Sequence, residues 1–268
     1  MQAQELSASQ IERLRAPTDW ADLDDESPLI TVQKIDRAHA LGVVGVLFTA
    51  EQVNARIKEL AALEHATRNG TVDQTVYAVV MKGGVPFASK LFSEIACLSP
   101  NMDPVVDYIQ ATRYGSSQAG KEALTITRQL DPKTDLKDKR FVKIDDTIDE
   151  GVTMGLLGSA AIDAEKCFAL GEGVSAPASE LGIITLTDKR IATMGDYEPS
   201  SILRGFWIPK VWAGGNGLDG ENEAMRWAPE LVVTSVQHEK YREVMPEVLD
   251  ILGERAILSM NEITWVSN

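Results

Sequence analysis

Three carboxylates follow a short, mostly apolar run near the middle of the chain. Asp145, Asp146 and Asp149 come directly after Phe141–Ile144, whose apolar and β-branched residues are typical of a strand. The next stretch, Gly151–Ala161, carries apolar residues at helical spacing. The free N–H groups of a helix N-terminus can bind a phosphate, and carboxylates can accept hydrogen bonds from hydroxyls or face a metal. Because an anion site and a polyol site are adjacent, the pattern predicts a sugar-phosphate ligand.

The composition excludes several classes of protein. The 268 residues are enough for one large α/β domain with appendages, and the hydrophobic fraction of 44% is ordinary for a globular protein. The formal net charge of −14 argues against non-specific nucleic-acid binding, which needs a basic surface. Cys97 and Cys167 are expected to be reduced thiols, and the three histidines show no zinc-ligand spacing. The chain shows no leader pattern and no apolar run near ~20 residues, so a cytoplasmic protein without a membrane span is expected.

Strand-like and helix-like stretches alternate along the chain. The strand-like stretches are Thr75–Met81, Val105–Ala111, Phe141–Ile144, Leu181–Leu186 and Leu231–Ser235, and helix-like stretches lie between them, as at Val85–Leu98 and Gly151–Ala161. This alternation predicts an α/β fold with a twisted, mostly parallel sheet flanked by helices. Ligands of such sheets lie at the carboxyl ends of the strands. The loops expected to meet there contain Lys82, Arg113, Asp145 and Asp219.

The stretch Asp145–Thr153 resembles the phosphoribosyl diphosphate (PRPP) loop of the type I phosphoribosyltransferases. In that family an apolar strand ends in two acidic residues, which are followed by two further residues, an Asp, a small residue, Gly, any residue and Thr. Four other stretches, in the family's order, resemble its hypoxanthine-guanine branch. They are Val79–Gly84, Ala111–Gly115, Leu186–Arg190 and Trp212–Asp219. The resemblance implies the phosphoribosyltransferase fold, with a small hood formed around Leu41–Phe48 and Lys189–Val233.

The resemblance assigns the ribose and its 5′-phosphate to the central stretch. Asp149 matches the catalytic Asp, which would take or share the proton at purine N7 and so make N9 a better nucleophile. Asp145 and Asp146 match the pair that accepts hydrogen bonds from the ribose hydroxyls and that can touch Mg²⁺. The 5′-phosphate cradle matches Glu150, Gly151, Val152 and Thr153. Glu150 departs from the usual Ser or Thr, so its side chain is expected to turn away from the phosphate.

The pyrophosphate contacts implied by the resemblance are Lys82, Gly83, Arg113, Tyr114 and Arg226. In many relatives a cis peptide bond precedes the residue that matches Lys82. Arg113 and Tyr114 begin a loop that would close over the pyrophosphate and exclude water. Arg226 lies one residue further from Asp219 than the family pattern has it.

The purine contacts implied by the resemblance are Ile148, Lys189, Trp212, Ala213 and Asp219. Lys189 would donate a hydrogen bond to O6, which selects 6-oxopurines over adenine. Trp212, in place of the usual Phe or Tyr, would stack on the base, and Ala213 would offer its backbone to the base edge. Ile148 would form an apolar wall. Asp219 would also coordinate a second Mg²⁺, directly or through water.

Together these matches predict an enzyme of purine salvage. It would join a 6-oxopurine (hypoxanthine or guanine, with xanthine left open) to PRPP, giving a nucleoside 5′-monophosphate and pyrophosphate with Mg²⁺. A homodimer or homotetramer is expected, without nucleic-acid or membrane partners. Residues 1–30 are predicted as an N-terminal extension, 31–236 as the phosphoribosyltransferase domain with its hood, and 237–268 as a C-terminal extension. No role is assigned to the two extensions or to the loop at 171–180.

Alternative interpretations remain at this level. The fold could serve a non-catalytic PRPP-binding regulator, a sugar-phosphate-binding scaffold, or a phosphoribosyltransferase for adenine or orotate. The presence of Asp149 and the acidic charge argue against the regulator, and Lys189 and Asp219 argue against another base. Each motif also has an ordinary structural interpretation, such as a solvated acidic loop, a glycine turn, or a core position for Trp212. Lys143 is unusual in a parallel strand, and a partly exposed face is expected there.

Overall fold

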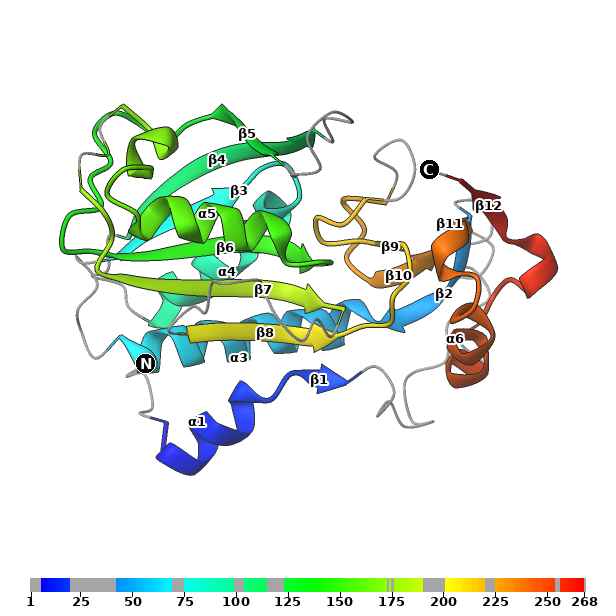
Figure 1. Cartoon of the computed structure of the whole chain (residues 1–268). Coiled ribbons are helices and arrows are strands. Elements are labelled where there is room, and N and C mark those ends of the chain that lie inside the picture. The colour runs from blue at the N-terminus through cyan, green and yellow to red at the C-terminus, as the bar shows by residue number, and fades with distance from the viewer. Residues whose placement is uncertain are drawn as a thin grey trace.

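A seven-stranded sheet forms the centre of the computed structural model, which describes residues 6–19, 42–68, 75–98, 104–114, 123–172, 174, 176–189, 201–219, 225–253 and 256–267. The strand order is β1-β8-β7-β6-β3-β4-β5 (Figure 1). The strands are β1 (Thr18–Asp19), β3 (Thr75–Val80), β4 (Val105–Tyr114), β5 (Ala123–Arg128), β6 (Arg140–Ile148), β7 (Glu180–Asp188) and β8 (Ser201–Trp207). Neighbours pair in parallel, except that β5 runs antiparallel to β4. The predicted α/β fold with a mostly parallel sheet is confirmed.

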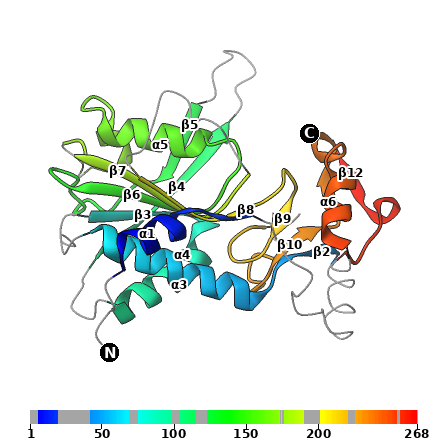
Figure 2. The same ribbon diagram turned by 90° about the horizontal axis from the view of Figure 1, so that it is seen from below.

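Helices cover both faces of this sheet. Helix α5 (Val152–Ile162) lies on one face, and α3 (Ala50–Thr67) and α4 (Gly84–Leu98) lie on the other (Figure 2). Helix α1 (Ala8–Arg15) contacts α3. Every residue of β3 is buried, as expected for a parallel strand covered on both sides. None of the described helices is long and apolar enough to cross a membrane.

The strands extend further than their apolar runs predict. Strand β6 continues through the acidic pair to Ile148, because β7 pairs with it as far as Asp188. The acidic pair therefore lies at the carboxyl end of the strand, as predicted, although the strand extends beyond the apolar run. Strand β4 continues to Tyr114, because β5 pairs with it along this stretch. A capping box at Thr49 begins α3.

Lys143 is fully buried, so the expectation of a partly exposed face was wrong. The side chain has 0% exposure, and Nζ donates a hydrogen bond to the backbone oxygen of Met154 at 2.8 Å. Burial lowers the pKa of Lys143 to about 7, because the charged form loses its hydration. The hydrogen bond joins β6 to the first turn of α5.

A second, smaller sheet forms the hood beside the carboxyl ends of the large sheet (Figure 1). It consists of β2 (Val43–Phe48), β10 (Leu231–Thr234) and β9 (Ala213–Gly214), in the order β2-β10-β9. Both pairings are antiparallel. The hood thus joins a segment that lies between β1 and β3 in the chain to segments that follow β8.

The C-terminal part of the chain packs on the hood. Strands β11 (Val236–His238) and β12 (Thr264–Val266) pair in parallel, and helix α6 (Met245–Leu252) lies between them in the chain. The backbone N–H groups of Ile257 and Leu258 both donate to the oxygen of Val44 in β2, at 2.6 and 3.1 Å. The residues predicted as a C-terminal extension therefore add to the hood.

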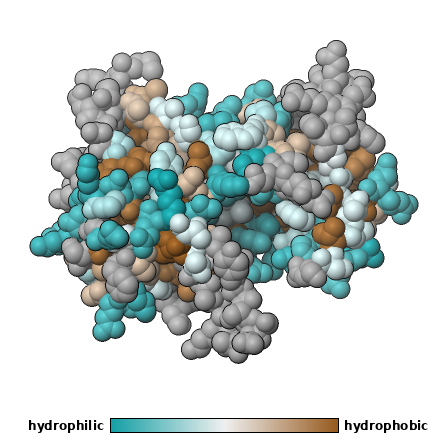
Figure 3. Space-filling model, turned by 90° about the horizontal axis from the view of Figure 1, so that it is seen from above, coloured by the Kyte–Doolittle hydropathy of each residue, from teal (hydrophilic) through white to brown (hydrophobic). Residues whose placement is uncertain are grey.

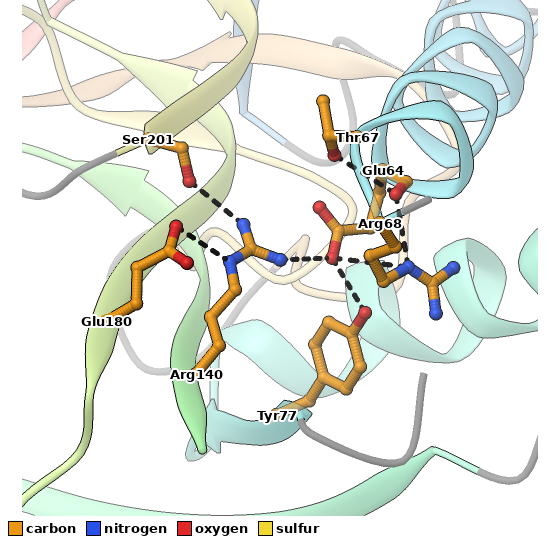
Figure 4. A network of polar contacts seen from close by, with 7 residues as sticks. All are labelled: Glu64, Thr67, Arg68, Tyr77, Arg140, Glu180 and Ser201. Atoms are coloured by element: carbon orange, nitrogen blue, oxygen red, sulfur yellow. Dashed lines mark hydrogen bonds and ion pairs between the residues drawn. The ribbon is translucent and has the colours of Figure 1, made fainter. Parts of the chain in front are cut away.

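A buried polar network lies at the amino ends of β3 and β6, away from the hood (Figure 4). Glu64 of α3 has no exposed surface and accepts hydrogen bonds from the Tyr77 hydroxyl at 2.7 Å and from Arg140 at 2.8 Å. Arg68 lies 3.6 Å from the same carboxylate, and Arg140 also contacts Glu180 at 3.6 Å. Burial raises the pKa of Tyr77, and the charge of Glu64 adds to the shift. This network connects α3 to the sheet.

Candidate active site

The candidate site lies at the point in the sheet where the chain stops adding strands on one side of β3 and begins to add them on the other. The chain runs from β3 to β4 on one side and later returns to β6 on the other. Parallel sheets open a crevice at the carboxyl ends of strands flanking such a point. The loop after β3 contains Lys82 and Gly83, and β6 leads into Asp149 and Glu150.

A pocket of about 220 Å³ lies at this end of the sheet, against the hood. Its lining residues are Asp146, Thr147, Asp149, Lys189, Trp212, Ala213, Leu218, Asp219, His238, Lys240 and Tyr241. Viewed from above, hydrophilic residues are spread over the molecular surface, including its middle (Figure 3). Six of the residues singled out in the sequence therefore meet in one cavity: Asp146, Asp149, Lys189, Trp212, Ala213 and Asp219.

The turn from β6 into α5 leaves backbone donors available. Gly151 has a φ of 74°, a conformation that favours glycine, and it caps α5 without a side-chain hydrogen bond. The first turn of α5 contains Val152 and Thr153. Their N–H groups, like those of any helix N-terminus, point toward the space ahead of the helix. This geometry suits an anion.

Asp145 and Asp146 lie side by side in a buried environment. Burial raises the pKa of Asp145 well above its usual range, and the charge of Asp146 and the hydrogen bond between the two carboxyl groups raise it further. Burial also raises the pKa of Asp146, against a hydrogen bond from Asp145 and the charge of Arg226, which lower it. A buried pair of this kind favours a cation or hydroxyl donors beside it.

Two loops meet beside Asp146 of β6. A Cβ on Gly83 would overlap the Asp146 carboxyl group, and a Cβ on Gly217 would overlap the backbone oxygen of Gly83. Only glycine therefore fits at these two close approaches. The peptide bond between Met81 and Lys82 is cis, as the resemblance implied. The loop with Lys82 and Gly83 thus packs directly on the acidic pair.

Lys189 and Asp149 form an ion pair at the pocket wall. Nζ of Lys189 lies 3.1 Å from Oδ1 of Asp149, and the two side chains are 7% and 35% exposed. Lys189 is placed at the end of β7, where its N–H donates to the oxygen of Ile148 at 3.0 Å. The pocket thus contains a donor and an acceptor within reach of one planar ligand.

Trp212 is held from three directions. Its indole N–H donates to the oxygen of Asp219 at 2.9 Å. The side chain of Gln237 accepts from the backbone N–H of Trp212 at 2.7 Å and donates to its oxygen at 2.9 Å. Thr234 donates to the same oxygen at 3.2 Å. These contacts fix an aromatic face beside Ala213 in the pocket.

Asp219 and Arg226 are paired. A nitrogen of the Arg226 guanidinium lies 2.5 Å from Oδ2 of Asp219, and another donates to the oxygen of Gly217 at 2.6 Å. The charge of Arg226 also acts on Asp145 and Asp146. The cation is thus placed between the glycine loop and the acidic residues.

The structure does not bring every predicted residue into the pocket. Ile148 is 1% exposed and packs in the hydrophobic cluster that contains Met154 and Leu157, so it does not line the cavity. Arg113 and Tyr114 are placed only by their backbone, as the last residues of β4. Residues 115–122, which include most of the predicted mobile loop, lie outside the described residues.

Four residues after β10 belong to the site without having been predicted. Gln237 holds Trp212, and His238, Lys240 and Tyr241 line the pocket. The signal in the sequence is weak: a short cluster of polar and aromatic residues follows a buried strand. Because the hood carries this segment back over the sheet, spacing in the chain gives no hint of its position.

The acidic residues fit a magnesium ion that binds together with a substrate. In the described part of the chain, no group of three or more His, Cys, Asp or Glu side chains could hold a metal unaided. Mg²⁺ is usually bound by one or two carboxylates together with substrate phosphates and water. The carboxyl groups of the half-buried Asp145 and the buried Asp146 supply such oxygen ligands.

Comparison with known proteins gives a consistent result. A family model described as the phosphoribosyl transferase domain matches residues 46–207. The hypoxanthine-guanine phosphoribosyltransferases of Mycobacterium bovis and Mycobacterium tuberculosis are 26% identical over 181 residues, which are 66% of this chain and 79% of theirs.

Solved structures share the fold. The hypoxanthine phosphoribosyltransferase from Staphylococcus aureus has a TM-score of 0.54 and 22% identity, covering 74% of this chain and 94% of that one. The hypoxanthine phosphoribosyltransferase from Trypanosoma cruzi, in complex with the product IMP, has a TM-score of 0.57 and 20% identity, covering 72% and 95%. Because the family model covers more than half of the sequence, the chain belongs to the phosphoribosyltransferase domain family, a group of pentosyl-transferring enzymes.

Proposed function

We propose that this protein is a 6-oxopurine phosphoribosyltransferase, which converts hypoxanthine or guanine and PRPP to the nucleoside 5′-monophosphate and pyrophosphate. The observation that carries the proposal is the Lys189–Asp149 pair, which lies in one pocket with Trp212. A 6-oxopurine presents an acceptor at O6 and a proton at N7 on one edge, and the pair supplies a donor and an acceptor. Curated relatives named as hypoxanthine-guanine phosphoribosyltransferases support this assignment.

The reaction divides between the base and the sugar. N9 of the purine forms a bond to C1 of the ribose as the C1–oxygen bond to pyrophosphate breaks, and the N7 proton moves to Asp149. In the structure Asp149 pairs with Lys189. When the base enters, Lys189 turns to O6 and leaves the carboxylate to act as general base. The transition state resembles an oxocarbenium ion, which the nearby carboxylates stabilise electrostatically.

The sugar phosphate occupies the turn between β6 and α5. The N–H groups of Glu150, Gly151, Val152 and Thr153 bind the 5′-phosphate, and Asp145 and Asp146 accept hydrogen bonds from the ribose hydroxyls. Lys82, Gly83 and the paired Arg226 lie on the pyrophosphate side. Bound Mg²⁺ would neutralise charge on the pyrophosphate. Asp145, Asp146 and Asp219 are the residues that would hold it.

A base-selection assay tests the proposal. Purified protein is incubated with PRPP, Mg²⁺ and, separately, hypoxanthine, guanine, xanthine or adenine, and nucleotide is measured. Nucleotide is expected from at least one 6-oxopurine and not from adenine. Lys189→Ala should raise the KM for the 6-oxopurine and leave the KM for PRPP nearly unchanged. Activity with adenine alone, or with no 6-oxopurine, contradicts the proposal. The same reaction without Mg²⁺ tests whether nucleotide formation depends on the metal.

We also propose that the protein works in the cytoplasm as a homodimer or homotetramer. Light scattering coupled to size-exclusion chromatography gives the mass directly, for comparison with the 29.2 kDa of one chain. A mass equal to that of one chain at working concentration would contradict this part of the proposal.

A further inference from the structure

The pocket has a wall from a part of the chain that the family model does not reach. The match ends at residue 207, whereas His238, Lys240 and Tyr241 line the pocket. These three residues, here called the C-terminal wall, come from the end of β11 and from the 3₁₀ helix η5 (Glu239–Tyr241). Pairing of β11 with β12 holds the segment in place.

Tyr241 contacts two cations. Its side chain is 7% exposed, and its ring centroid lies 5.3 Å from Nζ of Lys189 and 4.9 Å from Nζ of Lys240. A cation within about 6 Å of a ring centroid is attracted by the negative face of the ring. Tyr241 is thus the second contact of Lys189, beside Asp149.

This second contact matters most when a base is bound. A lysine side chain has large rotamer freedom, so its ammonium group needs fixed neighbours to keep one position. In the free protein Asp149 and Tyr241 both supply them. Once Asp149 engages N7 of a base, the ring of Tyr241 is the neighbour that still directs Lys189 toward the ligand.

Lys240 connects the C-terminal wall to the loop that follows β6 through an ion pair with Glu150. Its Nζ lies 3.9 Å from Oε1 of Glu150. Burial lowers the pKa of Lys240, but a hydrogen bond with Tyr241 and the charges of Asp149 and Glu150 outweigh it and leave the pKa raised. The ammonium group therefore stays charged beside the ring and the loop.

We propose that Tyr241 is a positioning residue for Lys189, and that the C-terminal wall thereby takes part in selecting a 6-oxopurine. The proposal rests on the proposed function, because that function assigns Lys189 to the base. It adds a residue from outside the matched family region to the determinants of base specificity.

Two substitutions distinguish the effect of the aromatic face of Tyr241 from the effect of its side-chain volume. Tyr241→Phe keeps the aromatic face, whereas Tyr241→Met keeps apolar volume and removes the face. We expect Tyr241→Met to raise the KM for the 6-oxopurine about tenfold and Tyr241→Phe by less than about threefold, with the KM for PRPP changed less than about twofold in both. Tyr108→Met is the matched control, because Tyr108 also lies near a cation, 6.0 Å from Arg128, but does not line the pocket. An unchanged base KM in Tyr241→Met, or equal losses for both substrates, would overturn the proposal.

A second measurement needs no turnover. The rate at which an acylating reagent modifies Lys189 is followed by mass spectrometry in the substrate-free proteins. The rate is expected to increase several-fold in Tyr241→Met and to stay near the wild-type value in Tyr241→Phe. Equal rates in all three proteins contradict the positioning role, even if the wild type turns over no purine. Failure of the wild type with every base instead contradicts the proposed function.

A third variant covers the case in which Tyr241→Met does not fold. Trifluorophenylalanine at position 241 has nearly the shape of phenylalanine but a weaker negative face. Its KM for the 6-oxopurine should exceed that of Tyr241→Phe. Equal KM values for these two proteins would exclude the contact with Lys189 as the cause.

Discussion

Glu150 is the residue at which the chain departs most clearly from the phosphoribosyltransferase pattern. Its side chain is 54% exposed and lies 3.9 Å from Lys240, so the carboxylate has a cation beside it. The sequence predicted that this side chain would turn away from the phosphate, and the contact with Lys240 gives it a partner outside the loop.

Replacement of Glu150 by Ser should strengthen PRPP binding. The change removes a negative charge near the 5′-phosphate and adds a hydroxyl donor, and a hydrogen bond to a charged group contributes about 1.5–3 kcal/mol. Because the released Lys240 offsets part of the change, we expect the KM for PRPP to fall by about threefold to tenfold. Steady-state kinetics at fixed base measure this, with Glu239→Ser as control. A higher KM would show that the Glu150 carboxylate itself assists binding.

The positions of several residues in the fold could be predicted from the sequence, because these residues lie close together in the chain. Asp149 and the glycine turn lie within one strand–helix unit, so the pattern predicted their neighbourhood correctly. The position of Ile148 was less predictable, because the side on which a strand residue faces depends on the register with β7. Ile148 consequently packs under α5, away from the pocket.

At the scale of elements, β6 and α5 form the unit that carries the site. Lys143 of β6 is joined to α5 by the hydrogen bond that its Nζ donates to the backbone oxygen of Met154. An apolar residue would be ordinary at this position, and the local pattern of residues does not predict the buried contact. A buried ammonium group is unfavourable, so the pKa of Lys143 is lowered.

The pH dependence of stability should reveal this lysine. The folded-state pKa is about 7, whereas the value in the unfolded chain is about 10.4. Between these pH values the unfolded state binds a proton that the folded state does not, so the free energy of unfolding rises with pH. We expect urea denaturation to show this rise between pH 7 and about 9.5 in the wild type and a smaller one in Lys143→Met. The same pH dependence in both proteins would mean that Lys143 titrates normally.

Most elements were predictable, and their ends were not. Apolar runs located β3, β4, β6 and β7 of the large sheet, but pairing with neighbours decided that β6 reaches Ile148 and β4 reaches Tyr114. The hood was harder to predict, because β2 and β10 are far apart in the chain and meet only in the folded protein. Gln237 reaches Trp212 and Tyr241 reaches the pocket only because β2 and β10 pair in the hood.

At the scale of the whole molecule, polar side chains cluster at both ends of the large sheet, and the two clusters differ in whether they face a cavity. The carboxyl ends of the strands carry the pocket. The amino ends carry the network around Glu64, in which buried groups pair with one another (Figure 4). The first arrangement leaves acidic and basic groups facing a cavity, and the second joins α3 to β3 and β6.

Loss of Arg140 should therefore lower stability without changing base selection. Arg140→Met leaves the fully buried Glu64 with fewer partners, and removing one member of a buried ion pair typically costs about 3–5 kcal/mol. Since Tyr77 and Arg68 still contact Glu64, we expect a loss of about 3 kcal/mol in the free energy of unfolding. Glu180→Gln, at the exposed end of the same network, should cost less than about 1 kcal/mol. Similar effects for the two variants in denaturant titrations would contradict this account of the network.

The most direct measurement compares the turnover of the wild type and Asp149→Asn with PRPP, Mg²⁺ and a 6-oxopurine. Asparagine keeps the shape of the side chain but cannot accept the N7 proton, so kcat should fall by about 10²- to 10⁴-fold. Binding of PRPP, measured by calorimetry, should change little. Asp163→Asn, at the far end of α5, is a control that should retain wild-type turnover. Equal kcat values for the wild type and Asp149→Asn would contradict the central claim that Asp149 is the base of a 6-oxopurine phosphoribosyltransferase.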